Sequence, residues 1–176
     1  MRSWLTIGAL LGLSCLLLLG LLGCSKPAAT SREDEVEAVV TRYDRLLAEG
    51  YRTMDMGRLR EVAEELQAED EYVHMSALGE GGVRLLPVLK ERKFVKVSVE
   101  ATSATVETRE VWDYTHEART TRKVLLVQKG MVYDMAWDLA LHPDGRWYVV
   151  DVRALSTTST APAQQIATPT PGSEHF

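Results

Sequence analysis

The hydrophobic pattern of this 176-residue chain changes its period once, close to Phe94. Before that point apolar residues recur every three or four positions, as they do along one face of an α-helix. After that point they alternate with polar residues, as they do in strands that bury one face of a sheet. Helices first and strands afterwards predict an α+β domain, in which the helices cover one face of an antiparallel sheet.

Three helical stretches precede the change of period. Thr30 and Glu33 have the spacing of a capping box that begins the first stretch, and Gly50 is expected to end it. A second stretch begins near Met56. A third covers residues 69–92, where a glycine-rich segment predicts a break. We therefore expect three helices packed on the sheet.

Five strands are expected after the change of period. The fourth has the clearest alternation, because its large apolar side chains, from Met131 to Leu141, all fall on one side. Short turns predicted at residues 128–130 and 142–146 join the last three strands into an antiparallel meander. The expected strands cover residues 94–99, 104–116, 121–128, 131–141 and 147–154.

The first 23 residues have the pattern of a secretory signal peptide. Arg2 precedes a nearly continuous apolar run that closes on Leu21-Leu22-Gly23-Cys24. This closing segment resembles the lipobox of bacterial lipoproteins, in which an aliphatic and a small residue precede an acylated Cys. We expect residues 1–23 to be removed by cleavage between Gly23 and Cys24, and Cys24 to carry lipid before a short linker that ends at residue 32. The alternative is a plain membrane span of about 20 residues.

The signal peptide predicts a lipid-anchored protein in the bacterial cell envelope. Ser25 after the acylated Cys, in place of Asp, resembles the sorting signal for an outer membrane, which would leave the domain facing the periplasm. At the other end, residues 156–176 are rich in Thr, Ser, Ala, Pro and Gln. Such a segment buries too little apolar surface to offset the entropy of ordering, so we expect a disordered tail.

Charge and composition argue against several classes of function. The formal net charge is -5 at pH 7, and no run of Lys or Arg occurs, so a nucleic-acid partner is not expected. The chain has two Cys, Cys15 in the leader and Cys24 at the lipid, which leaves no thiol for redox chemistry. Met54 and Met56 are isolated, and the His residues lack the spacing of metal ligands, so no metal or other cofactor is expected. These His residues are His74, His116, His142 and His175.

Two segments carry a resemblance to a known superfamily. They are the aromatic stretch at residues 108–114 and the closing stretch at residues 144–152, which begins Asp-Gly-Arg-Trp. They resemble the nuclear transport factor two-like superfamily, and the chain is most similar to the domain in the intermembrane-space part of plastid division proteins. The resemblance covers residues 33–155 and implies a cone-shaped fold, with a cavity between three helices and a curved sheet of about five strands. Members include isomerases and cyclases as well as domains without catalysis, so the fold alone assigns no activity.

Aromatic side chains are the main candidates for a binding site. We expect them to line an apolar pocket or a sheet surface, or simply to form the core. An enzyme would need a carboxylate or His in the cavity opposite a Tyr, and the candidates are Asp134, Asp138, His116, Tyr114 and Tyr133. However, Asp134 and Asp138 lie opposite the bulky face of their strand and are expected to face solvent. The aromatic candidates are Trp112, Tyr114, Tyr133, Trp137 and Trp147.

These observations favour a membrane-anchored lipoprotein whose domain binds or scaffolds without catalysis. Its expected partners are the membrane, through lipid on Cys24, and an envelope protein, a second copy of the chain or a small apolar ligand. One alternative is a cavity that binds a small molecule or acts as an isomerase-like or cyclase-like enzyme, and another is a purely structural spacer. A carboxylate inside a closed cavity would favour the enzyme, and an exposed apolar sheet face would favour a protein partner.

Overall fold

The computed structural model describes residues 31–160 together with the pair Gln164–Gln165. The predicted signal peptide, the cleavage site before Cys24 and most of the predicted tail lie outside the described residues. None of the helices in the described range is both long and apolar enough to cross a bilayer.

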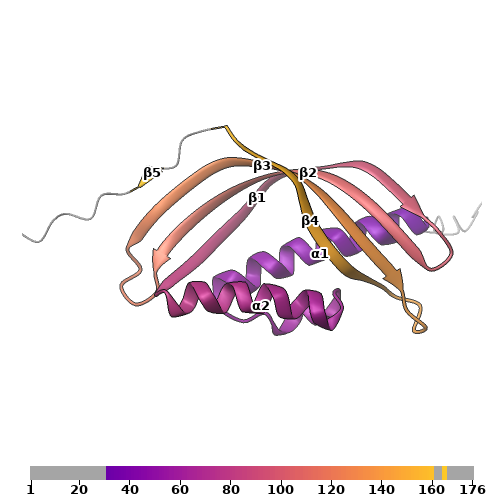
Figure 1. The fold of residues 1–176 in the computed structure, drawn as a ribbon, viewed down its shortest axis with the longest axis horizontal. Helices are drawn as coiled ribbons and strands as arrows, with labels where there is room; N and C mark the ends of the chain where they lie inside the picture. Colours follow the sequence, from indigo (N-terminus) through magenta and orange to yellow (C-terminus); the bar gives the residue numbers. More distant parts are fainter. Residues whose placement is uncertain (1–30, 161–163, 166–176) are drawn as a thin grey trace, which may run out of the picture. The chain divides into compact units, whose positions relative to one another are not determined.

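Two α-helices, a short 3-10 helix and four long strands make up the domain (Figure 1). The strands form one antiparallel sheet in the order β1-β2-β3-β4, and a two-residue strand, β5, pairs with β3. Figure 1 shows α1 and α2 on the concave side of the curved sheet. The predicted α+β class is confirmed. In chain order the elements are α1 (Arg32–Thr53), η1 (Gly57–Glu61), α2 (Glu65–Glu80), β1 (Val83–Val99), β2 (Ser103–Ala118), β3 (Val124–Leu141), β4 (Trp147–Ser159) and β5 (Gln164–Gln165).

The prediction of three helices was wrong, because the third helical stretch divides between a helix and a strand. Residues up to Glu80 belong to α2, whereas the rest of the stretch forms the first half of β1. Gly82 has a left-handed backbone, with φ of 74°, and separates the two elements. Pro87 lies in β1, which is an edge strand, where a residue without an N–H is tolerated. The second predicted helix is only the short η1 and the start of α2.

The prediction of five similar strands was also wrong, because its third and fourth strands are one strand, β3. Tyr114 pairs with Gln128 and Trp112 pairs with Met131, so β3 has one more residue than β2 between these pairs. The segment predicted as a turn is therefore a β-bulge inside a continuous strand. Gly130 supplies its left-handed backbone, with φ of 64°. The bulge leaves Gln128 and Met131 on the same face, which breaks the alternation that the sequence shows.

The capping box of α1 lies one residue later than predicted. Ser31 accepts a hydrogen bond from the Asp34 N–H and donates its own N–H to the Asp34 carboxylate, both at 3.0 Å. Gly50 does not end the helix, which continues to Thr53. A Cβ on Gly50 would lie 2.3 Å from the sulfur of Met56, so this glycine makes room for the chain that follows α1.

The core lies between the two helices and the concave face of the sheet, and β3 contributes to it as its alternation predicts. Trp137 and Leu139 are buried, while Asp134 and Asp138 pair with Arg109 and Arg153 on the other face. β4 continues to Ser159, four residues beyond the predicted end of the domain. The largest fully buried apolar side chains are those of Val36, Val40, Tyr43, Leu59, Val106, Trp137 and Val149.

Candidate functional site

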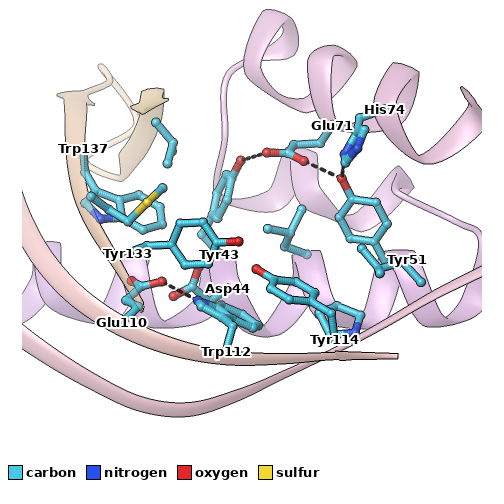
Figure 2. A pocket seen from close by; sticks show the side chains of 15 residues that line it. Tyr43, Asp44, Tyr51, Glu71, His74, Glu110, Trp112, Tyr114, Tyr133 and Trp137 are labelled. Carbon is cyan, nitrogen blue, oxygen red and sulfur yellow. Dashed lines mark hydrogen bonds between the residues drawn. The ribbon is translucent and has the colours of Figure 1, made fainter. Parts of the chain in front are cut away.

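A cavity of about 220 Å³ lies between the sheet and the helices (Figure 2). It is smaller than most sites for drug-sized ligands, which occupy about 300–1,000 Å³. Its occupant must therefore be small. Both helices and all four long strands contribute to the walls, through Tyr43, Asp44, Leu47, Tyr51, Glu71, His74, Leu85, Pro87, Glu110, Trp112, Tyr114, Tyr133, Met135, Trp137 and Val152.

The periodicity of two elements delivers carboxyl groups to this apolar space. Along α1, Asp44 follows Val40 by four residues and precedes Leu47 by three, so it lies on the same inward stripe. Along β2, Glu110 lies two residues before Trp112, so both side chains point to the concave face. The helix and the strand thus each place one acid where an apolar residue would be expected.

Asp44 and Glu110 form a buried acidic pair around one arginine. Their side chains are 3% and 2% exposed, and that of Arg92 is 9% exposed. Arg92 donates a hydrogen bond to Asp44, and its Nε lies 3.5 Å from Oε1 of Glu110. Glu110 also accepts hydrogen bonds from the indole of Trp112 at 2.8 Å and from the hydroxyl of Thr108 at 2.9 Å. Each of the two carboxyl groups therefore has at least one hydrogen-bond donor as a partner.

Burial raises the pKa of Asp44 well above its usual range, and the neighbouring Glu110 carboxylate raises it further. Arg92 opposes both effects without cancelling them. One guanidinium charge cannot neutralise two carboxylates, which favours the protonated form of Asp44. A protonated carboxyl group at this wall can donate a hydrogen bond as well as accept one.

A second polar cluster lies where α2 meets α1. Glu71 accepts hydrogen bonds from the hydroxyls of Tyr43 and Tyr51, at 3.2 and 3.0 Å (Figure 2). Gln67 donates to the Tyr43 hydroxyl at 2.8 Å, and the Tyr51 hydroxyl also contacts Nδ1 of His74. Burial raises the pKa of Glu71, while the two tyrosine hydroxyls act to lower it. Two phenol hydroxyls thus hold the carboxyl group, and His74 also acts to lower its pKa.

Aromatic rings form the wall opposite this cluster. The rings of Trp112 and Tyr114 stack with centroids 6.2 Å apart, and Tyr133 meets Tyr114 edge-on at 6.3 Å. Burial raises the pKa of Tyr114, and a hydrogen bond with Tyr133 raises this pKa by a smaller amount. Its hydroxyl therefore stays protonated at neutral pH and can serve as a hydrogen-bond donor.

The structure brings four of the five predicted aromatic residues together in the cavity, namely Trp112, Tyr114, Tyr133 and Trp137. Trp147 is buried elsewhere in the core. The guanidinium carbon of Arg32 lies 5.2 Å from the centroid of the Trp147 ring. Of the predicted enzyme candidates other than tyrosine, neither the two aspartates of β3 nor the His of β2 lines the cavity. Asp134 and Asp138 make ion pairs on the opposite face of the sheet.

Sequence analysis missed the three carboxyl groups of the cavity, which are those of Asp44, Glu71 and Glu110. A signal was present for two of them, because Asp44 interrupts the apolar stripe of a helix and Glu110 occupies an inward position of a strand. Glu71 follows Gln67 by four residues on a helix with little contrast between its faces, so its position carried no signal. Within the described residues no cluster of three or more His, Cys, Asp or Glu could hold a metal ion.

Neither a known protein-family profile nor the sequence of a curated protein matches this chain. The structure is similar to that of the intermembrane space region of the chloroplast protein ARC6, with a TM-score of 0.59 and 14% sequence identity. The similarity covers 72% of this chain and 98% of the ARC6 region. The chain therefore shares the fold of that region.

Two further solved structures have lower scores. One is from Catenulispora acidiphila, with a TM-score of 0.45 and 10% identity over 68% of this chain and 91% of that one. The other is from Kribbella flavida, with a TM-score of 0.46 and 11% identity over 73% of this chain and 95% of that one.

Proposed function

We propose that this protein is a lipid-anchored binding protein of the bacterial cell envelope, and that its domain holds a small, mainly apolar molecule in the cavity. The observation that supports this proposal is the cavity itself, where four aromatic side chains surround a space that also receives carboxyl and hydroxyl groups. Ligand sites are typically apolar hollows with a few polar groups that fix orientation. The lipid anchor rests on the sequence at Cys24.

The bonding of the carboxyl groups favours binding over catalysis. A general base is weakened by each hydrogen bond that its carboxylate accepts, because the bond stabilises the charged form and lowers its basicity. Glu110 already accepts two hydrogen bonds, and Glu71 accepts one on each oxygen. These groups are therefore suited to orient a ligand through the hydroxyls and the indole that they hold in place.

A specific observation favours a second candidate function, an isomerase-like enzyme. Asp44 lines the cavity and has a raised pKa, as a carboxyl group that donates a proton to a substrate would need. Tyr114, with its protonated hydroxyl, lines the same space. Asp44 would act as the acid and Tyr114 as the donor that stabilises a developing negative charge.

Calorimetric titration of the full-length protein in lipid nanodiscs tests the binding proposal. Phenol, indole and 2-naphthol are suitable probes, because each has an apolar body and one polar group. We expect saturable binding of at least one probe, weakened roughly tenfold or more by Leu47→Phe, which fills the cavity. Leu155→Phe is the matched control, since Leu155 is 58% exposed on β4. No binding, or equal binding to both variants, would contradict the proposal. Chemical conversion of a bound probe, seen by mass spectrometry, would favour the enzyme.

The anchor has a separate test. Metabolic labelling with an alkyne fatty acid should mark the wild-type protein, and mass spectrometry should place the mature N-terminus at Cys24. Cys24→Ser should remove the label and leave uncleaved precursor. A native N-terminus at another residue, without lipid, would refute this part of the proposal and leave the cavity unaffected.

A further inference from the structure

A second pocket, of about 260 Å³, shares no residue with the aromatic cavity. It lies at the end of the domain where α1 finishes, β1 begins and β2 turns into β3 (Figure 1). Four of its six lining residues are arginines, and we call it the arginine pocket. The lining consists of Arg52, Thr53, Met54, Arg84, Arg119 and Arg122.

Positive charge in the arginine pocket exceeds the negative charge beside it. Glu117 lies 2.7 Å from Arg84 and 3.8 Å from Arg122, measured between charged atoms. Among the described residues neither Arg52 nor Arg119 takes part in an ion pair. Four guanidinium groups against one carboxylate leave an excess of three positive charges, although the whole chain has a formal net charge of -5. A local excess of this kind attracts an anion.

The hydrogen-bond donors of this pocket also outnumber their acceptors. Arg84 donates to the carbonyl oxygen of Arg52 at 3.3 Å and to Glu117 at 2.7 Å. Its Nε is buried and has no hydrogen-bond partner within the part of the chain that the structure describes. The guanidinium group of Arg119 makes one long hydrogen bond, of 3.4 Å, to the carbonyl oxygen of Gly79 within the described residues. A buried donor without an acceptor is costly, and an anion beside this cluster would supply acceptors.

The backbone of the pocket is itself unusual. Met54 and Arg122 both have φ of 62°, and they are the two non-glycine residues with positive φ in the described ranges. Arg122 closes the turn between β2 and β3, where its N–H donates to the carbonyl oxygen of Ala118 at 2.8 Å. Glycine or asparagine normally occupies such a position, because the Cβ of an L-residue comes too close to the following carbonyl oxygen there and glycine has no Cβ. The turn thus holds a guanidinium group at the pocket despite that cost.

We propose that the arginine pocket binds a phosphate group. Guanidinium groups match phosphate oxygens through paired N–H donors, and several around one anion bind it more strongly than an exposed single pair. A polar, positively charged lining does not suit the apolar ligand of the main cavity. The same phosphate chemistry occurs in a free phosphate ester and in the headgroup of a membrane lipid, and the experiment separates these two sources.

The first measurement is the binding of inorganic phosphate to the full-length protein in phosphatidylcholine nanodiscs, by calorimetry at constant ionic strength. We expect saturable binding that Arg119→Gln/Arg122→Gln weakens roughly tenfold or more. Both arginines lack a short ion pair, so the double variant should fold. Arg146→Gln is the control, because Arg146 is exposed in the β3–β4 turn, forms an ion pair with Asp144 and does not line the arginine pocket. Absence of saturable binding, or equal weakening in the control, would overturn the proposal.

The second measurement identifies the source of the phosphate. Hydrogen exchange of the turn at residues 119–123 is compared in nanodiscs of phosphatidylcholine with and without phosphatidylglycerol. Protection that rises with phosphatidylglycerol, and that free phosphate displaces, would indicate a lipid headgroup. Protection by free phosphate alone would indicate a soluble phosphate ester. Protection that persists in Arg119→Gln/Arg122→Gln would overturn the proposal.

Discussion

Single buried residues give this domain its most distinctive chemistry. Asp44 lies on the core-facing side of its helix and Glu110 on the core-facing side of its strand. Both carboxyl groups can be buried because neighbouring side chains provide hydrogen bonds to them. Arg92 serves both, and Trp112 and Thr108 complete the hydrogen bonding of Glu110. The residue pattern predicts burial at these positions, but the partners come from other elements and could not be read from either segment alone.

The raised pKa of Asp44 gives stability a pH dependence of definite sign. In the unfolded chain this carboxyl group loses its proton at a pH of about 3.9, whereas the folded chain holds the proton to higher pH. The folded state therefore binds more protons above that value, and its stability falls as pH rises. Asp44→Asn cannot ionise and still offers Arg92 an oxygen. We expect its free energy of unfolding, relative to wild type, to rise between about pH 4 and pH 8 in urea titrations. A difference independent of pH would contradict this prediction.

Truncation of two neighbouring residues of β3 should affect stability to very different extents. Trp137 is 1% exposed, donates a hydrogen bond to Thr108 and meets Tyr43 edge-on. We expect Trp137→Ala to lower the free energy of unfolding by about 3–5 kcal/mol, through lost burial and a cavity. Asp138 pairs with exposed Arg153 on the other face, so Asp138→Ala should change it little. Chemical denaturation measures both. A clear gain in stability for Asp138→Ala would show that this carboxylate is held under strain.

At the level of elements, the bulge in β3 depends on one glycine. Gly130 and Gly145 both have a left-handed backbone, with φ of 64° and 79°. Alanine at either should cost about 1–2 kcal/mol in backbone strain. A Cβ on Gly130 would also lie 2.0 Å from the Thr160 hydroxyl, whereas one on Gly145 would meet no atom within 4 Å. We therefore expect Gly130→Ala to lower the melting temperature more than Gly145→Ala. Equal effects would mean that Thr160 moves aside freely.

The sequence predicted helices and strands correctly where one face of the segment is buried in the core and the other faces solvent. The stripe of α1 and the alternation of β3 from Met131 onward both satisfy this condition. The prediction failed for β1, because Pro87 and two bulges disturb the alternation of an edge strand. The sequence predicts a turn at Gly130 and not a bulge, because glycine in a left-handed conformation is common in both turns and bulges.

At the scale of the whole molecule, the end of β4 lies beyond the predicted boundary at residue 155. Ser156 pairs with Asp134 and Ser159 pairs with Met131, so these polar residues extend the sheet. Composition predicts disorder here because serine and threonine bury little surface, yet backbone hydrogen bonds need no apolar side chain. The pairing could be seen only once the length of β3 was known.

The boundary gives a direct test. A chain that ends at Leu155 loses this pairing, and each ladder hydrogen bond contributes about 0.5–1.5 kcal/mol. A chain that ends at Thr160 keeps it and serves as the control. We expect the shorter chain to have the lower melting temperature by calorimetry. Identical melting temperatures would show that the last four residues of β4 contribute nothing to stability.

The sequence predicts the lining residues of the two candidate sites to different extents. Aromatic residues in alternating strands predict an apolar wall, and four of the five named line the cavity. The arginine pocket left no trace in the sequence, because Arg52, Arg84, Arg119 and Arg122 are scattered over α1, β1 and a turn. Only the folded arrangement brings them together, so the absence of a basic run argues against a nucleic-acid surface but carries no information about a small anion site.

The four long strands are ordered in the sheet as they are in the chain, and this affects the entropy cost of forming the sheet. The connections between successive strands are short, at residues 100–102, 119–123 and 142–146. Each strand pairing therefore closes only a small loop, and the entropy lost in closing a loop grows with its length. Contacts more distant in sequence include those of α1 and α2 with β4. The four long strands can thus pair as successive hairpins, whereas the helix–sheet contacts that enclose the cavity close longer loops.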